Sequence, residues 1–96
     1  MPTQTEEQIG INISGEPALG GPWVVILYND EYHGIDEVVL QVQKATGCSL
    51  EKAVLITFTA HTEGRAICYD GTETECERVA GVLRQIRLQV ETDRAV

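Results

Sequence analysis

The hydrophobic and polar positions along the chain change period several times, and each change predicts a new element. Residues 23–28 (WVVILY) form a continuous run of β-branched, aliphatic and aromatic side chains, which is typical of a buried strand. Asn29 and Asp30 should end this strand, because both side chains favour turns. In residues 35–46, apolar side chains recur with the i, i+3, i+4, i+7 spacing of a helix that buries one face.

A second helix is predicted to start after Ser49, whose side chain can cap its first turn, and to end near residue 61 or 62. Gly64 is expected to stop this helix, and residues 65–70 (RAICYD) are typical of a short second strand. We expect one broad apolar face on the helix, made of Leu50, Ala53, Val54, Thr57, Phe58 and His61.

Thr72 and Glu75 have the spacing of a capping box, which predicts that a third helix begins here. Its apolar stripe is expected to contain Val79, Val82, Leu83 and Ile86. Residues 88–92 (LQVET) alternate between apolar and polar, as a half-buried strand should. The element order is therefore β-α-α-β-α-β. It predicts an α+β fold, a compact sandwich in which a three-stranded sheet packs against helices.

The 96 residues suggest one domain preceded by a short arm. Residues 1–21 mix Thr, Gln, Glu, Gly and Pro with few apolar side chains, so we expect a flexible N-terminal arm there. The alternation of Ile9, Ile11 and Ile13 leaves room for a short edge strand within it. Residues 22–96 are expected to form the core domain.

Composition removes several classes of function. The formal charge is −8, from 15 acidic and 7 basic residues, and a surface this acidic repels phosphate backbones, so we expect no nucleic-acid partner. The same charge attracts cationic groups, including a free α-amino terminus. No apolar run is long enough to span a bilayer, and residues 1–10 lack the pattern of a signal peptide. We therefore expect a cytoplasmic protein with no membrane partner.

The three cysteines, Cys48, Cys68 and Cys76, form no Cys-x-x-Cys pair and are odd in number, so we expect small core residues rather than a disulfide framework. Together with His33 and His61 they match no compact zinc motif. No oxyanion hole or activated thiol marks a hydrolase. The sequence thus predicts no metal, no cofactor and no catalytic residue.

Two short motifs at a fixed separation resemble the ClpS family. The first is Asn-Asp-Glu-Tyr at residues 29–32, directly after the first strand. The second is Ala-His-Thr-Glu-Gly-Arg-Ala at residues 60–66, at the end of the second helix. ClpS proteins typically carry Asn-Asp-(Asp/Glu)-Tyr, and about thirty residues later Val-His-x-x-Gly-(Lys/Arg)-Ala. The resemblance covers roughly three quarters of the chain and fades toward the C-terminus.

The resemblance implies a monomeric, non-enzymatic adaptor for protein degradation. ClpS-like proteins bind bacterial N-degrons, which are peptides with a free α-amino group and a bulky apolar first residue. They deliver these clients to a ClpA- or ClpC-type AAA+ unfoldase coupled to the ClpP protease. By position, the amino group would be held by Asn29, Asp30 and His61. An amide carbonyl, a carboxylate and a neutral imidazole are suitable acceptors for an ammonium group. Glu31 and His33 could touch the peptide backbone.

The same resemblance assigns a pocket for the first side chain, lined by Ile35, Val38, Thr57, Ala60 and Leu88. The family's usual Thr-Pro-Met after the tyrosine is His33-Gly34-Ile35 here, and its Met is regarded as a gatekeeper against β-branched first residues. Thr57 and Ala60 are smaller than the usual residues, which predicts a roomier pocket that favours aromatic first residues over Leu. Glu73 and Arg78 are the counterparts of the family's unfoldase contacts.

Plainer interpretations stay open for each motif. Asn-Asp after a strand is an ordinary turn in most proteins, and a single His at a helix end is often a cap or a surface residue. The pocket residues could all be core, and Glu73 and Arg78 could be a solvated helix face. An alternative class is a protein-interaction domain resembling the C-terminal domain of the ribosomal stalk protein, which shares the element order. Only the adaptor requires Asp30 and His61 to converge beside an apolar pocket.

Overall fold

A computed structural model describes residues 23–95, and within them the six elements follow the predicted order. The N-terminal arm and the strand considered at residues 9–13 lie outside the described residues. In chain order the elements are β2 (Trp23–Tyr28), α1 (Ile35–Thr46), α2 (Leu50–Glu63), β3 (Arg65–Gly71), α3 (Glu73–Arg84) and β4 (Val90–Arg94).

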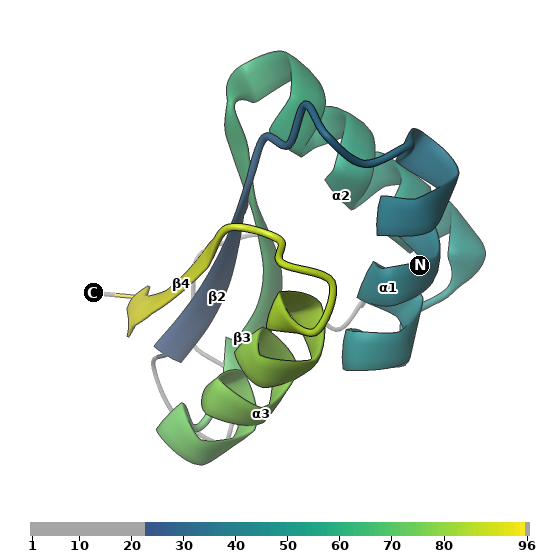
Figure 1. Cartoon of the computed structure of the whole chain (residues 1–96). Coiled ribbons are helices and arrows are strands. Elements are labelled where there is room, and N and C mark those ends of the chain that lie inside the picture. The colour runs from purple at the N-terminus through teal and green to yellow at the C-terminus, as the bar shows by residue number, and fades with distance from the viewer. Residues whose placement is uncertain (1–22, 96) are drawn as a thin grey trace, which may run out of the picture.

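The sheet has β2 at its centre, between β3 on one side and β4 on the other (Figure 1). Both pairings are antiparallel, and Leu27 of β2 lies opposite Ala66 of β3 and Val90 of β4. The pairing with β3 shifts register between Val25 and Ile26, so β2 carries an irregularity near its middle. The central strand is therefore the first one along the described chain, and both of its partners come much later.

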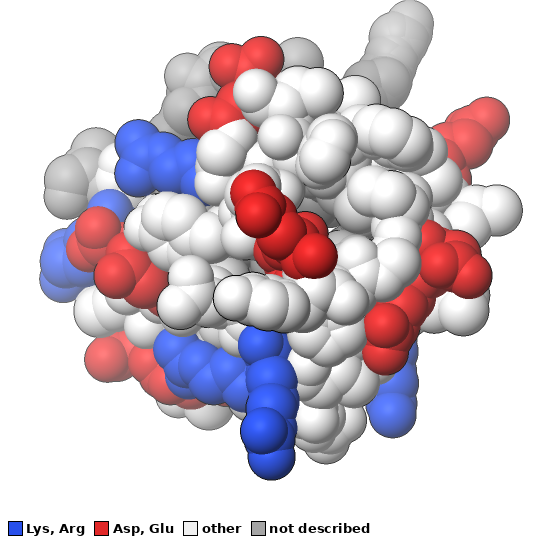
Figure 2. Space-filling view, turned by 45° about the horizontal axis from the view of Figure 1, so that its top comes forward, with Lys and Arg blue, Asp and Glu red and all other residues white. Residues whose placement is uncertain are grey.

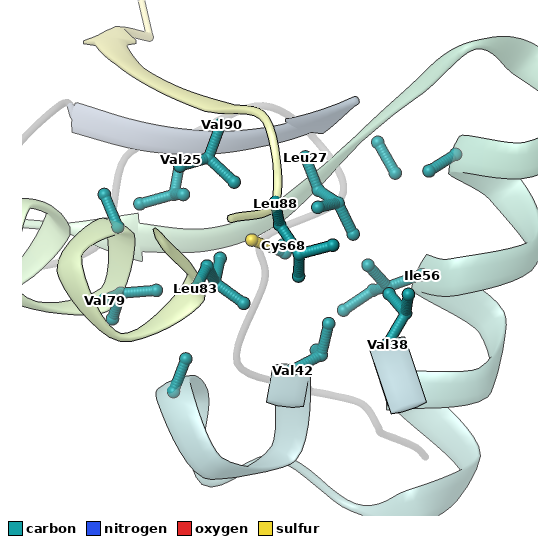
Figure 3. Packing of buried hydrophobic residues seen from close by; sticks show 14 of the residues in the cluster. Val25, Leu27, Val38, Val42, Ile56, Cys68, Val79, Leu83, Leu88 and Val90 are labelled. Atoms are coloured by element: carbon teal, nitrogen blue, oxygen red, sulfur yellow. The ribbon is translucent and has the colours of Figure 1, made fainter. Parts of the chain in front are cut away.

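The three helices lie on one face of the sheet (Figure 1). α3 and α2 contact the strands, and α1 packs across both of these helices. Between the layers lies a continuous core whose largest fully buried side chains come from β2, α1 and α3: Leu27, Leu83, Val25, Val42, Val79 and Cys76. Figure 3 shows the first five of them. The α+β sandwich expected from the sequence is confirmed.

The expected buried face of α2 is partly wrong. The structure buries Ala53, Ile56, Thr57 and Ala60, whereas Leu50, Val54 and Phe58 are between 36% and 56% exposed and His61 is also exposed. Apolar residues occur almost all around this helix, so its pattern alone does not choose one side. The choice is made by packing, because α2 must contact α1 and β3 at once.

The last strand begins two residues later than predicted, and Leu88 is not part of it. Arg87 adopts a left-handed conformation with φ 67°, which is uncommon for a residue other than glycine. The backbone N–H of Leu88 then bonds the carbonyl of Leu83 at 3.4 Å. Leu88 therefore fills the core before the chain enters β4 at Val90 (Figure 3). Alternation in the sequence could not reveal this turn.

The predicted starts of α2 and α3 and the stop of α2 are confirmed, but α3 ends at Arg84, so Ile86, which we expected on its apolar stripe, lies in the turn that leads toward β4. The Ser49 hydroxyl accepts the backbone N–H of Lys52 at 3.1 Å, which caps α2. At the start of α3, Thr72 accepts the N–H of Glu75 at 3.0 Å, and the Glu75 carboxylate accepts the N–H of Thr72 at 3.2 Å. Gly47 ends α1 in a left-handed conformation that a glycine adopts without strain.

The capping box of α3 gives a direct test of stability. Thr72→Ala should lower the free energy of unfolding by about 1 kcal/mol, because it removes the side-chain acceptor of an otherwise unpaired helix N–H. Urea unfolding followed by circular dichroism measures the change. Thr74→Ala is the matched control, since Thr74 is exposed inside the same helical turn and caps nothing in the described structure. Equal losses in both variants would contradict the role of the cap.

Two of the three cysteines are core residues, as expected. Cys68 and Cys76 are buried free thiols, and Cys48 is half-buried beside the core. Burial raises the pKa of Cys68 to about 12 and that of Cys76 to about 11, so neither is a thiolate at neutral pH. Among residues 23–95, no three His, Cys, Asp or Glu side chains are grouped so that they could hold a metal ion. Nor does this part of the chain contain a helix with the length and apolar composition needed to cross a membrane.

Candidate functional site

The candidate site lies where the chain leaves β2 and passes the C-terminal end of α2. The backbone N–H of Asn29 donates to the carbonyl of Gly64 at 2.9 Å, which ties the loop after β2 to the end of the helix. Gly64 ends α2 with a φ of 95°, a left-handed conformation that glycine adopts more readily than other residues. His61 lies one turn earlier. The strand exit and the helix end therefore meet, as the spacing of the two motifs required.

A small pocket opens at this junction. It encloses about 270 Å³ of empty space, part of which is open to solvent. The space that is enclosed in the present conformation is much smaller, about 20 Å³ or room for about one water molecule, so a bulky side chain could enter only if the walls move apart. Its lining residues are Leu27, Tyr28, Asn29, Asp30, His33, Ile35, Val38, Thr57, Ala60 and His61.

The polar end of the pocket contains Asn29, Asp30 and His61. Within residues 23–95, the side chains of Asn29 and His61 make no hydrogen bond to another protein group. The Asn29 amide oxygen and one His61 ring nitrogen are thus available as acceptors. His61 is exposed and Asn29 is half-buried, so both can be reached from solvent.

Asp30 is already held by its own loop. Its Oδ1 accepts the backbone N–H groups of Tyr32 at 2.6 Å and His33 at 3.0 Å, and its Oδ2 lies 2.5 Å from Nδ1 of His33. Burial alone would raise the pKa of Asp30, but these hydrogen bonds outweigh burial and hold the pKa below its usual value. The carboxylate is ionised at neutral pH. Each carboxylate oxygen can accept about two hydrogen bonds, so Oδ2 keeps one position for a further donor.

The apolar end of the pocket is formed by α1 and α2. Val38, Thr57 and Ala60 are buried there, and Ile35 is 38% exposed. The Thr57 hydroxyl donates to the carbonyl of Ala53 at 2.8 Å, so its hydrogen bonding is satisfied inside α2. Thr57 can therefore serve as an apolar wall. An apolar group could enter here while a cationic group attached to it bonds the polar end.

Several residues proposed from the sequence lie elsewhere. Leu88 does not line this pocket; it is 3% exposed in the core and borders a separate hollow beside Tyr28 and β4. Glu31 is exposed and is not part of the lining. Glu73 is exposed in the first turn of α3, and Arg78 of that helix donates to the carbonyl of Ala45 at 3.3 Å.

The structure also adds residues that sequence reasoning missed. Leu27 and Tyr28 line the pocket because β2 runs directly into it. The contact between His33 and Asp30 was not expected either. Its signal was present, because an Asp followed three residues later by a His in a turn allows the carboxylate to bond its own loop.

Charge is spread over the surface around these elements. Figure 2 shows acidic side chains distributed over one face, with uncharged surface between them and fewer basic groups. Basic side chains gather in one area at the lower edge of this view and are otherwise scattered, and the formal charge of the whole chain is −8. Such a surface favours the approach of a cationic ligand over that of a polyanion.

This combination defines a small α+β binding domain with acceptors at one end of an apolar pocket. Residues 20–91 match the family described as "ATP-dependent Clp protease adaptor protein ClpS". The chain belongs to the ClpS family, as its two motifs indicated.

Individual relatives include a ClpS adapter and a much larger ligase. The chain is similar to the ClpS adapter of Streptomyces avermitilis, with 37% identity over 57 residues that make up 59% of this chain and 54% of that protein. It is also 32% identical over 68 residues, 71% of this chain, to the E3 ubiquitin-protein ligase UBR1 of Drosophila melanogaster. Those residues are only 4% of the ligase, so the chain spans a small part of that relative.

A solved structure with the same fold is Agrobacterium tumefaciens ClpS2 bound to L-phenylalaninamide. The two folds superpose with a TM-score of 0.71 at 20% sequence identity, over 75% of this chain and 94% of that one. At this identity the match establishes the fold, so the structural comparison also confirms the predicted α+β fold.

Proposed function

We propose that this chain is an N-degron adaptor that binds clients by a free α-amino group and a bulky apolar first residue. The observation that carries the proposal is the convergence of Asn29, Asp30 and His61 at the polar end of one small pocket with apolar walls. These three residues come from a strand exit and a helix end about thirty positions apart. A ribosomal-stalk-like interaction domain gives no reason for that convergence.

In this proposal, the polar end holds the client's ammonium group. That group has three N–H donors and one positive charge. The Asn29 carbonyl, the remaining acceptor position on Asp30 and a neutral His61 nitrogen would accept one hydrogen bond each. Hydrogen bonds between charged partners are about twice as strong as neutral ones, so most of the selectivity for a free N-terminus would come from Asp30.

The first side chain of the client would enter between Ile35, Val38, Thr57 and Ala60. Full burial of a Leu- or Phe-sized side chain contributes roughly 1.5–3 kcal/mol. Since the pocket encloses only about 270 Å³ including its open mouth, the half-exposed Ile35 is the wall best placed to adjust to a large ring. The preference for aromatic first residues over Leu stays a prediction.

Delivery completes the proposal. We assign the chain a ClpA- or ClpC-type AAA+ unfoldase as partner, a monomeric state, a cytoplasmic location and no catalytic step, because it belongs to an adaptor family. Glu73 and Arg78 would contribute to the unfoldase contact from α3. The N-terminal arm at residues 1–21, outside the described residues, would engage the unfoldase, and residues 22–96 would form the client-binding core. Agrobacterium ClpS2 bound to L-phenylalaninamide supports the choice of an aromatic client with a free amine.

Calorimetry with a Phe-led peptide and its N-acetylated twin tests the proposal. Acetylation removes the positive charge and two of the three N–H donors, so we expect affinity to fall at least tenfold, about 1.4 kcal/mol. A Leu-led peptide of otherwise identical sequence measures the expected aromatic preference in the same series. Equal binding of the free and acetylated peptides would overturn the proposed function.

A further inference from the structure

His33 holds an unusual position in the candidate site. Its ring lines the pocket, and its Nδ1 lies 2.5 Å from Oδ2 of Asp30, the same oxygen that keeps a position for a client. The Asp30 side chain is only 9% exposed and the His33 side chain 18%, so the contact is largely shielded from water. An Asp30–His33 contact of this kind places a titratable group directly on the acceptor that the client needs.

The surroundings of His33 favour its charged form. The hydrogen bond to Asp30 is the largest cause that raises its pKa, against a smaller opposing effect of burial. A hydrogen bond to the backbone of Ile86 raises it as well, and only a carbonyl acting as acceptor has that effect.

The polar and titratable groups around His33 come from its own loop, from α1, from the turn after α3 and from α2. Asp30 lies in its own loop, and Glu37 in the first turn of α1 also favours the positive charge. The turn after α3 supplies the carbonyl of Ile86. From α2, His61 lines the same pocket and is the second titratable ring beside it.

We propose that His33 competes with the client's ammonium group for the Asp30 carboxylate, so that acidification releases clients from this adaptor. This inference rests on the proposed function and concerns how pH regulates client binding. When His33 is an imidazolium, it neutralises Asp30 and repels the incoming ammonium. When His33 is neutral, Asp30 faces the client as an uncompensated anion. The residue that departs from the family's usual Thr thus makes client capture depend on pH.

Linkage fixes the direction and the size of the effect. The pKa of His33 is raised in the free protein, so its charge is present below that pKa and is lost as pH rises through it. Two like charges about 5 Å apart in a partly exposed site weaken binding by about tenfold. Affinity should therefore fall about tenfold as pH drops through the pKa of His33, which lies above its usual value. By the same linkage, a bound client should lower the pKa of His33 by about one pH unit.

Protonation of His61 would also weaken peptide binding, because a protonated ring cannot accept a hydrogen bond from the ammonium group. The effects of the two histidines must therefore be separated. The chain contains only two histidines. Single variants His33→Gln and His61→Gln therefore assign both ring signals in an NMR titration without further work. Each ring then reports its own pKa in the wild-type protein, with and without a saturating Phe-led peptide.

The binding experiment compares the wild type with two variants by calorimetry at pH 5.5, 6.5 and 7.5. His33→Gln keeps a neutral donor for Asp30, and we expect it to bind the Phe-led peptide tighter at pH 5.5 and to retain only the His61 part of the pH dependence. His33→Lys keeps a permanent charge and should bind weakly, about tenfold below the wild type at pH 7.5. The client's own titration is the same in all three proteins.

The outcomes separate this inference from the function on which it rests. If the peptide binds but the His33 pKa does not move, or if His33→Gln keeps the full wild-type pH dependence, the competition is wrong and the adaptor function stands. If none of the three proteins binds the Phe-led peptide at any pH, the proposed function is wrong, and the proposed competition is wrong with it. A fall in the His33 pKa on binding, with a flatter profile in His33→Gln, supports the inference.

Discussion

Asp30→Ala should reduce affinity for a Phe-led peptide by about 30- to 1000-fold, equal to about 2–4 kcal/mol. The substitution removes the one anion at the polar end of the pocket. It also removes the hydrogen-bond partner of His33, and with it the main cause of the raised His33 pKa. Calorimetry at pH 7 measures the loss, and peptide-free circular dichroism checks that the domain stays folded.

Asp30→Asn is the control that separates charge from loop geometry. An amide oxygen can still accept the N–H groups of Tyr32 and His33, so the turn should persist, while the negative charge is gone. We expect most of the affinity loss in Asp30→Asn and an additional loss in Asp30→Ala. Unchanged binding by Asp30→Asn would show that the amine is not held by this carboxylate.

Leu83→Ala should lower the free energy of unfolding by about 2–5 kcal/mol. Leu83 is 0% exposed and belongs to the core between α3 and the sheet, so truncation leaves a cavity that rigid neighbours cannot fill. Domains of this size are stable by only about 5–15 kcal/mol, so the loss is a large fraction of the total. Urea unfolding measures it.

Leu40→Ala provides the comparison on an exposed leucine. Leu40 lies on α1 and is 62% exposed, so its removal should change stability by about 0.5 kcal/mol or less. Similar losses in the two variants would mean that Leu83 does not pack as described. The comparison also separates burial from helix propensity, because both positions exchange the same two residue types within helices.

Local signals in the sequence predicted the elements well because their physics is local. The caps at Ser49 and Thr72 and the stop at Gly64 each depend on residues within one helical turn, and all three are confirmed. The prediction that Asn29 and His61 lie in one pocket had a different basis, because it rested on the resemblance of the two motifs to those of a family.

The errors arose where packing between distant elements decides. α2 is apolar on nearly every side, so only contact with α1 and β3 selects Ile56 over Phe58 for burial. Leu88 fills the core because Arg87 turns the chain in a conformation that no pattern of apolar residues encodes. The Asp30–His33 contact is different, because it is local and its signal was present in the sequence but was not used.

The central position of β2 has a consequence for the order in which the site can form during synthesis. The strand leaves the ribosome first among the described elements, but its partners β3 and β4 follow roughly forty and seventy residues later. The backbone N–H of Tyr28, the residue before Asn29, donates to the carbonyl of Gln89, so the C-terminal segment adds a restraint on the approach to the pocket beside the one that Gly64 provides. Contacts between residues so distant in sequence form late in folding. A nascent chain that ends before β4 lacks this restraint, so under the proposed function we expect it to hold clients less firmly than the chain with β4 in place.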